Sequence, residues 1–212
     1  MEPGANPSKV VCVGRNYLAH ARELGSEIPT RPLLFLKPPS AIIRAGDPIH
    51  LPADVGRVDF EGEIAFVVGK RARHVPKGEG WGYISYVLPA NDITARELQR
   101  AEDQWTRAKG FDSFLPLGRP VPISEVPIEA LSVTTRLNGE VVQDAPLSDA
   151  VFSPGLLVEY VSRTMTLEPG DLILTGTPSG VGPLRPGDEV EVTVAGVGSV
   201  ANPVVAATGP DD

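Results

Sequence analysis

Residues 59–69, with the sequence DFEGEIAFVVG, constrain the fold more than any other part of the chain. If this segment is an extended strand, side chains at alternate positions point to the same face. Glu61 and Glu63 then share one face. The other face is apolar and holds Phe60, Ile64, Phe66 and Val68. Two like charges side by side on a strand built for burial repel each other unless a cation lies between them. The segment therefore predicts a buried strand whose two carboxylates hold a cation.

A third carboxylate, Asp92, follows an apolar run at 81–90 that we predict to be a second strand. Three hard oxygen donors, with no thiolate or imidazole among them, suit Mg²⁺ or Mn²⁺ better than zinc. The next residues fit a capping box in which Thr94 caps a helix and Glu97 reaches back to it, which leaves Asp92 free as a ligand. The alternatives are solvated charges on an edge strand for the Glu pair and a helix cap for Asp92. Asp59 shares the Glu face and either orients a ligand or merely begins the strand.

Glycine and proline divide the chain into short apolar runs. The 212 residues include 22 Gly and 22 Pro. We therefore expect one β-rich α+β domain over 1–212, with residues 1–8 and 208–212 as loose tails. A hairpin is predicted at 132–143, with strands on either side of the favoured Asn138-Gly139 turn. The other predicted strands are 9–13, 32–39, 171–175, 189–194 and 199–205, and short helices are predicted at 17–24 and 156–161.

Charge and hydropathy exclude several classes of protein. The net charge is −8 and no Lys/Arg-rich tract is present, so nucleic acid is not an expected partner. No apolar run approaches the roughly 20 residues that span a bilayer, and the first residues lack the pattern of a signal peptide. The single Cys12 forms no internal disulfide and is interpreted as a small apolar core residue. These features predict a cytoplasmic protein with no membrane partner.

Six strings resemble the fumarylacetoacetate hydrolase family and occur in its order along the chain. They are VGRNY (13–17), LFLKP (34–38), DFEGE (59–63), NDITAR (91–96), AKGFD (108–112) and LTGTPSGVG (174–182). The resemblance spans roughly 10–204 and is to short members, which lack the extra N-terminal domain of the fumarylacetoacetases. It implies a mixed β-sheet rolled into a sandwich-like body with short helices, and usually a homodimer. It also implies a Mg²⁺ or Mn²⁺ ion and small-molecule 2-oxo acid substrates.

The resemblance also implies roles for individual residues at the cation. Glu61, Glu63 and Asp92 match the metal ligands of the family. Lys109 matches a lysine of the site, whose ammonium would hold the substrate's carboxylate or polarise its keto oxygen. A lysine outside such a motif is usually solvated. Lys37 lies in a family-like string and is either part of the site or structural.

A second group of residues is expected around the substrate. His20 and Glu23 stand three apart on the predicted short helix and can form a carboxylate–imidazole pair that activates water. In the family a matching pair lies on a segment that closes over the substrate. Arg96 and Gln99, at i and i+3, match pocket positions, with solvated helix residues as an equal alternative. Thr177 would offer backbone or hydroxyl contacts to the substrate carboxylate, although a tight turn alone would explain its neighbouring glycines.

The expected activity is that of a metal-dependent hydrolase. It would cleave the C–C bond of acylpyruvate-type 2,4-dioxo acids through a metal-stabilised pyruvate enolate. The alternative within enzymes is an oxaloacetate decarboxylase or an isomerase of the 2-hydroxyhepta-2,4-diene-1,7-dioate type in aromatic catabolism. A non-catalytic ligand-binding or metal-binding protein on the same fold is the alternative of another class.

Overall fold

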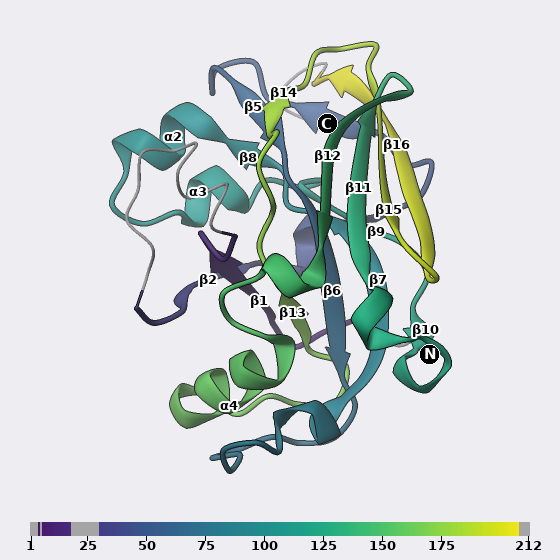
Figure 1. Ribbon diagram of the computed structural model, residues 1–212. Coiled ribbons are helices and arrows are strands. Elements are labelled where there is room, and N and C mark those ends of the chain that lie inside the picture. Colours follow the sequence, from purple (N-terminus) through teal and green to yellow (C-terminus); the bar gives the residue numbers. More distant parts are fainter. Residues whose placement is uncertain (1–3, 5, 18–29, 208–212) are drawn as a thin grey trace.

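The computed structural model describes residues 4, 6–17 and 30–207, which form packed sheets with short helices at their edges (Figure 1). The largest sheet holds β1 (Val10–Gly14), β2 (Leu33–Lys37), β3 (Ile42–Arg44), β6 (Gly62–Val68), β7 (Ile84–Asn91), β9 (Leu115–Leu117), β10 (Val121–Pro122) and β13 (Leu172–Leu174). Its strand order is β2-β1-β13-β6-β7-β9-β3, with β10 paired to β7. The β1–β13 and β3–β9 pairs are parallel, whereas β6 is antiparallel to β7 and β13, so the sheet is mixed.

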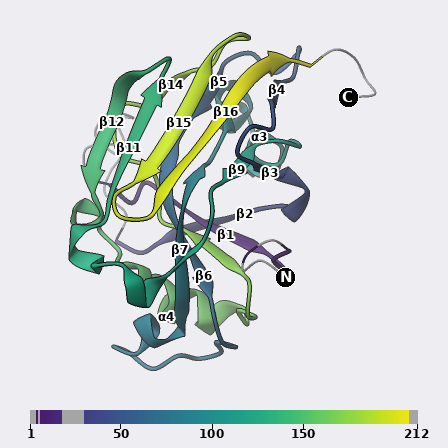
Figure 2. The ribbon, with the colours of Figure 1, turned by 90° about the vertical axis from the view of Figure 1, so that its right-hand side faces the viewer.

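A second sheet packs across the first, as the turned view shows (Figure 2). It holds β4 (Ile49–Leu51), β11 (Ser132–Leu137), β12 (Glu140–Pro146), β15 (Glu189–Val194) and β16 (Gly198–Ala206), in the order β12-β11-β15-β16-β4. The predicted hairpin is confirmed as β11 and β12. Asn138 and Gly139 have φ values of 52° and 85°, the left-handed conformation that a two-residue type I′ turn requires.

The third sheet is small and lies beside two short helices. It consists of β5 (Val58–Phe60), β8 (Thr94–Ala95) and β14 (Gly182–Pro183). The helices α2 (Arg96–Ala101) and α3 (Thr106–Lys109) contact β8 and lie at the upper left of Figure 1. Short 3₁₀ helices occur at Pro39–Ala41, Gly80–Tyr83, Ile123–Glu125, Ile128–Ala130 and Leu147–Asp149.

Helix α4 (Pro154–Thr164) covers the opposite end of the largest sheet (Figure 1) and includes the predicted helical segment 156–161. Ser153 caps it by accepting a hydrogen bond from the Leu156 N–H, and Pro154 occupies the first turn, where its missing N–H costs nothing. Among the described residues, no helix is long and apolar enough to cross a membrane.

The main apolar core lies between the two larger sheets and α4. Its members include one face of β6, the inner faces of β11 and β15, and the buried side of α4: Ile64, Phe66, Val68, Val133, Val192, Val194, Leu157, Val158 and Val161. A second cluster covers the other face of β6 through Ala65 and Val67. The expected β-rich α+β fold, a mixed sheet rolled into a sandwich with short helices, is therefore confirmed.

The single strand predicted at 59–69 is divided in the structure. β5 ends at Phe60 and β6 begins at Gly62, and the two strands belong to different sheets. Glu61 lies between them, where its N–H donates to Asn91 Oδ1 and its carbonyl accepts from the Asp92 N–H. The chain changes sheets at this residue because β5 pairs with β8 whereas β6 pairs with β7. The sequence pattern alone contains no signal for that exchange of partners.

The predicted capping box at Thr94 is wrong. Helix α2 begins at Arg96, and the Thr94 hydroxyl instead donates to the Asp92 carbonyl. Thr94 belongs to β8 and lies opposite Asp59 of β5, so tertiary strand pairing overrides the local capping preference. The strand predicted at 81–90 also begins later, at Ile84, because Gly80–Tyr83 form a 3₁₀ turn.

Asp171 joins the N-terminal segment to the turn before β13. Its carboxylate accepts hydrogen bonds from the Ser8 hydroxyl, the Lys9 N–H and the Glu168 N–H, at 2.7, 3.1 and 2.8 Å, and pairs with the Lys9 ammonium. Burial raises the pKa of Asp171, but these donors outweigh it, so the pKa lies below its usual value. The ionised carboxylate therefore stabilises the folded chain.

We predict that Asp171→Asn lowers the free energy of unfolding by about 2 kcal/mol at neutral pH, because the amide loses the ion pair and at least one acceptor. A carboxyl group whose pKa is lower in the folded than in the unfolded state stabilises the folded protein at pH values above its unfolded pKa, which is about 3.9 for Asp. This stabilisation is lost as the pH falls below that value toward the folded pKa. Urea unfolding between pH 7 and pH 3 should show the gap to the wild type closing below about pH 4. The exposed Asp103→Asn is the control, and a gap that stays constant down to pH 3 would contradict the prediction.

Candidate metal centre and active site

The structure brings the three predicted carboxylates together. One oxygen from each of Glu61, Glu63 and Asp92 lies within 4.8 Å of the other two, and all three residues are buried. The antiparallel pairing of β6 with β7 causes this, because Gly62 lies opposite Asn91 and so places Asp92 beside the two glutamates. Residues that are about thirty positions apart in sequence thus meet at one end of the largest sheet.

Glu63 is the least neutralised of the three carboxylates. Its Oε2 accepts a hydrogen bond of 2.7 Å from the Gly176 N–H. Within the described ranges, no Lys or Arg lies within ion-pair distance of it. Burial, and then the charges of Asp92 and Glu61, raise the pKa of Glu63 well above its usual value. A cation placed among the carboxylates would remove this penalty.

Two buried lysines neutralise the rest of the cluster. Lys109 Nζ donates to Glu61 Oε2 at 2.9 Å and to Asp92 Oδ2 at 2.6 Å. Burial lowers the pKa of Lys109, but the charges of Asp92 and Glu61 outweigh it, so the pKa lies above its usual value and the side chain stays charged. Lys37 Nζ donates to Asp92 Oδ1 at 2.7 Å and to the Ile93 carbonyl at 3.1 Å. Lys37 therefore orients Asp92, a role the sequence left open.

The donor set fits a divalent cation. All three donors are carboxylate oxygens, which Mg²⁺ and Mn²⁺ prefer over Zn²⁺. Glu61 and Asp92 already have lysine partners, whereas the buried Glu63 has a backbone N–H, so the cluster carries unneutralised negative charge. Glu61, Glu63 and Asp92 would hold the ion through one oxygen each, and the hard cation would supply the missing positive charge.

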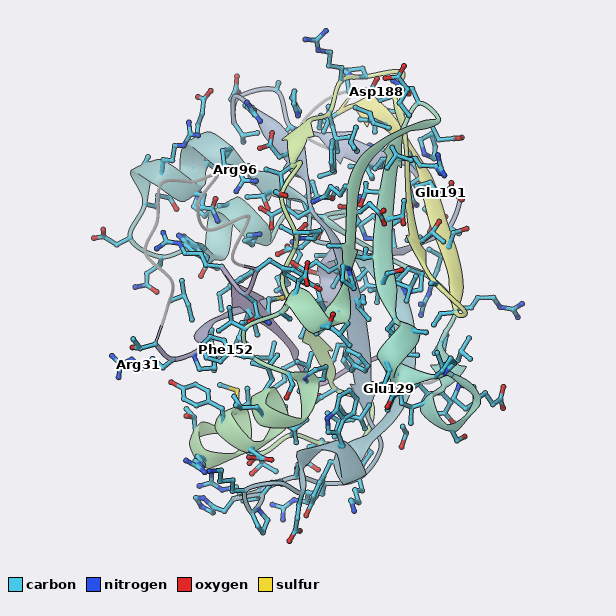
Figure 3. All side chains as sticks on the ribbon, in the orientation of Figure 1. Arg31, Arg96, Glu129, Phe152, Asp188 and Glu191 are labelled. Carbon is cyan, nitrogen blue, oxygen red and sulfur yellow. The ribbon has the colours of Figure 1, made fainter. Side chains whose placement is uncertain are left out.

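A chain of ion pairs holds Arg96 against this centre. Arg96 Nη2 donates to Glu61 Oε1 at 2.7 Å, Nε to Asp59 Oδ2 at 3.0 Å, and Nη1 to Gln99 Oε1 at 2.6 Å. Asp59 also accepts from Arg57 Nε at 2.6 Å. Asp59 is buried and positions Arg96, so it does more than begin a strand. Arg96 is the first residue of α2 and lies away from Glu191, which belongs to β15 of the second sheet (Figure 3).

A cavity of about 450 Å³ opens onto the carboxylates. Its lining includes nearly all of the predicted site residues that the structure describes: Glu61, Glu63, Asp92, Arg96, Gln99, Lys109 and Thr177. One side is aromatic, since the rings of Phe35 and Trp105 meet edge to face with centroids 5.3 Å apart. Lys109 Nζ lies 4.9 Å from the centroid of the Phe35 ring. The cavity therefore has a charged end and an apolar wall.

Thr177 is placed at the cavity, but its hydroxyl is engaged within the protein. Thr177 Oγ1 donates to the Gly62 carbonyl and accepts from Gln143 Nε2, both within 2.9 Å. Its backbone N–H has no acceptor in the described part of the chain and is the donor left for a ligand. Gln143 also accepts from the Gly62 N–H and was missed by the sequence, because nothing local distinguishes this strand residue.

The predicted pair His20 and Glu23 lies outside the described residues, as does the helix predicted at 17–24 apart from its first residue. Asn16, immediately before it, donates through Nδ2 to the Phe152 and Thr175 carbonyls at 3.0 and 2.7 Å and accepts from the Phe152 N–H. The chain that leads to the predicted pair is therefore anchored beside the loop that carries Thr177.

Gly62 lies between the two glutamates and has no room for a side chain. A Cβ there would lie 1.9 Å from Thr135 Oγ1 and 3.1 Å from Gln143 Oε1. We predict that Gly62→Ala destabilises the protein by about 2–3 kcal/mol through this overlap. Thr135→Ala should restore part of that loss, because the hydroxyl it removes has no hydrogen-bond partner among the described residues.

Chemical denaturation of the two single variants and the double variant measures this coupling. Gly82→Ala is the matched control, because the nearest atom to a Cβ there is 3.9 Å away. If the changes in unfolding free energy of the two substitutions simply added, the predicted overlap between the new Cβ and the Thr135 hydroxyl would be contradicted.

We predict that Glu63→Gln raises the stability of the metal-free protein by about 1 kcal/mol, because it removes a buried carboxylate that has no cationic partner. The same substitution should abolish stabilisation by Mn²⁺. In the wild type, Mn²⁺ at about 100 times its dissociation constant adds about 2.7 kcal/mol.

Thermal unfolding in EDTA measures the expected gain in stability of the metal-free variant. Thermal unfolding with Mn²⁺, together with calorimetric titration, measures the expected loss of stabilisation by the ion. The exposed Glu129→Gln is the control. Unchanged Mn²⁺ affinity in Glu63→Gln would show that the ion binds elsewhere.

Comparisons with known proteins identify the family of the chain. The family model Fumarylacetoacetate (FAA) hydrolase C-terminal matches residues 9–205. The oxaloacetate tautomerase FAHD1, mitochondrial, of Arabidopsis thaliana is 40% identical over 198 residues, covering 91% of this chain and 89% of the relative.

Two solved structures are similar over almost the whole chain. The 5-carboxymethyl-2-hydroxymuconate delta-isomerase from Mycobacterium smegmatis has a TM-score of 0.89 and 45% identity, covering 96% of this chain and 81% of that one. The fumarylpyruvate hydrolase from Pseudomonas aeruginosa, solved in complex with Mn²⁺ and pyruvate, has a TM-score of 0.89 and 30% identity, covering 95% and 91%. The chain belongs to the fumarylacetoacetate hydrolase family.

Proposed function

We propose that this chain is a divalent-metal-dependent enzyme that acts on 2-oxo acids by stabilising their enolates. The observation that carries the proposal is the buried trio of Glu61, Glu63 and Asp92 in the lining of a cavity, where the charged Lys109 bridges Glu61 and Asp92. A bound divalent ion would supply Lewis-acid polarisation of the substrate's oxygens. The fumarylpyruvate hydrolase of similar structure was solved with Mn²⁺ and pyruvate, which supports both the ion and the class of ligand.

Lys109 has the chemistry to stabilise developing negative charge. Its ammonium has three N–H donors, two of which bind Glu61 and Asp92, so the third is available to an oxygen in the cavity. The carboxylates keep it protonated, so it donates a hydrogen bond and a full positive charge without being consumed. Arg96, Gln99 and the Thr177 N–H line the same cavity and offer donors to the carboxylate of the 2-oxo acid.

C–C hydrolysis of an acylpyruvate is the first reaction to test. Water adds to the 4-carbonyl carbon, the C3–C4 bond breaks, and the acyl group leaves as a carboxylic acid. The electron pair of that bond remains as the enolate of pyruvate, which takes a proton at C3. The His20–Glu23 pair that the sequence predicts would accept the proton from the attacking water.

Enol–keto isomerisation is the second candidate, and the names of the more similar relatives favour it. An oxaloacetate tautomerase and a hydroxymuconate isomerase share 40% and 45% identity with this chain, against 30% for the fumarylpyruvate hydrolase. Both reactions pass through an enolate next to a carboxylate, so Lys109 and Arg96 would serve either. Decarboxylation of oxaloacetate also leaves a pyruvate enolate and needs no attacking water.

A substrate panel with matched variants separates these reactions. We predict that the protein turns over at least one of acetylpyruvate, fumarylpyruvate, enol-oxaloacetate and 2-hydroxyhepta-2,4-diene-1,7-dioate with Mg²⁺ or Mn²⁺, and none of them in EDTA. Lys109→Met should lower kcat by about 100-fold for every substrate that the protein turns over, because the hydrogen-bond donor to the enolate oxygen is lost. His20→Asn should lower hydrolysis by about 100-fold while decarboxylation persists.

Lys70→Met is the control for Lys109→Met, because Lys70 also lies over an aromatic ring, at 4.2 Å from the Tyr83 centroid, but outside the cavity. Full activity of Lys109→Met, or turnover of the panel by metal-stripped protein, would refute the proposed chemistry.

A further inference from the structure

Two arginines that have no partner among the described residues line the more exposed part of the cavity. Arg15 directly follows β1, and Arg100 lies in the last turn of α2, so they come from distant parts of the sequence. Arg100 is exposed and Arg15 is half-buried, whereas the three carboxylates are buried. In the part of the chain that the structure describes, neither guanidinium has a hydrogen bond or an ion pair. Among the described residues, four other arginines pair with acids and several exposed ones, such as Arg119 and Arg185, do not; the paired ones are Arg57, Arg71, Arg96 and Arg107.

The chain around Arg15 is firmly held. Its backbone has φ 58°, a left-handed conformation that residues other than Gly adopt rarely. The side chain of the next residue, Asn16, is buried and bound to the backbone of Phe152 and Thr175. Before Arg15, the ring of Trp105 packs against Gly14, where a Cβ would lie 3.0 Å from it. Arg15 is therefore presented from a fixed turn beside the aromatic wall of the cavity.

The charges of the cavity lining do not balance without a ligand. Among the described lining residues, three carboxylates, from Glu61, Glu63 and Asp92, face four cationic side chains: Lys109, Arg96, Arg15 and Arg100. The two inner cations already bind the carboxylates, so the excess positive charge lies with the outer arginines. A divalent ion at the inner end would increase the excess further. A substrate with one carboxylate would neutralise only the inner end of the cavity. A substrate with two carboxylates would place one negative charge at the inner end and the other beside the outer arginines.

We propose that Arg15 and Arg100 form a second anion subsite that binds the distal carboxylate of a dicarboxylic 2-oxo acid, so that the protein selects doubly charged substrates over singly charged acyl analogues. This inference rests on the proposed function, because the 2-oxo acid end must bind at the carboxylate trio. The carbon chain between the two charged ends lies along Phe35 and Trp105, which line the same cavity. A guanidinium suits this role because its planar fork binds a carboxylate through two donors.

Binding of two non-cleaved ligands of equal length tests the subsite without requiring any reaction. The ligands are 2-oxoadipate, which has a distal carboxylate, and 2-oxohexanoate, which has a methyl group in its place. Calorimetric titration of the Mn²⁺-loaded wild type should show 2-oxoadipate binding about 10–100-fold more tightly, as a charge-assisted hydrogen-bonded pair gives. The preference should weaken with added salt, because the outer arginines are near solvent.

Variants assign the preference to the two arginines. Arg100→Met, on the exposed face of α2, should reduce it several-fold, and the Arg15→Met/Arg100→Met double variant should reduce it to about twofold or less. The affinity for 2-oxohexanoate should change little, since that ligand has no distal charge. The exposed Arg119→Met, outside the cavity, is the control and should keep the wild-type preference.

The outcomes distinguish the subsite from the reaction. Equal affinities for the two ligands in the wild type, or a preference that survives the double variant, would overturn the subsite and leave the proposed function standing. The wild type could prefer 2-oxoadipate and lose that preference in the double variant, yet turn over none of the panel substrates. That result would support the subsite and overturn the proposed reaction. Failure of both ligands to bind the metal-loaded protein would overturn both.

Discussion

Burial of four carboxylates in a small volume is the constraint on which the rest of this structure depends. Asp59, Glu61, Glu63 and Asp92 are all nearly inaccessible to solvent, and an ionised carboxylate inside a protein costs several kcal/mol unless it is paired. The chain meets that cost with Lys37, Lys109 and Arg96, each of which is buried and contacts at least one of the acids. Glu63 is the exception among the described residues: it has a backbone N–H partner but no cation, and burial with the neighbouring carboxylates raises its pKa.

The fold is arranged so that these charges arrive from separate elements. β6 and β7 bring the carboxylate trio together, β2 contributes Lys37, α2 contributes Arg96 and α3 contributes Lys109. A displacement of any one of these elements would leave a buried charge unpaired. Such coupling penalises alternative packings strongly, which holds the cavity in one geometry. The same rigidity would pre-organise donors toward an enolate, so the cost of burying the charges and the proposed chemistry have one structural origin.

The two ends of the cavity differ in how their charge is held. At the inner end, Lys109 and Arg96 are tied to carboxylates, so their positions are fixed. At the outer end, Arg15 and Arg100 have no acid to hold them within the described chain and are closer to solvent. Under the proposed function, such an arrangement would bind one part of a ligand with fixed geometry and attract another part by charge. The protein as a whole is acidic, with a net charge of −8, so under the proposed function these arginines would supply the local positive charge that attracts an anionic substrate.

The sequence by itself determined the features that depend on local pattern. Alternation in 59–69 identified Glu61 and Glu63, the Asn138-Gly139 turn identified the hairpin, and ordered motifs identified the family. What only the tertiary structure decided is which partners the elements take: the break at Glu61, the use of Thr94 in a strand, and the contacts of Lys37 and Gln143. The physical reason is that the exchange of strand partners and the buried hydrogen bonds and ion pairs join residues 17 to 81 positions apart. Their free energy depends on contacts that no local propensity records.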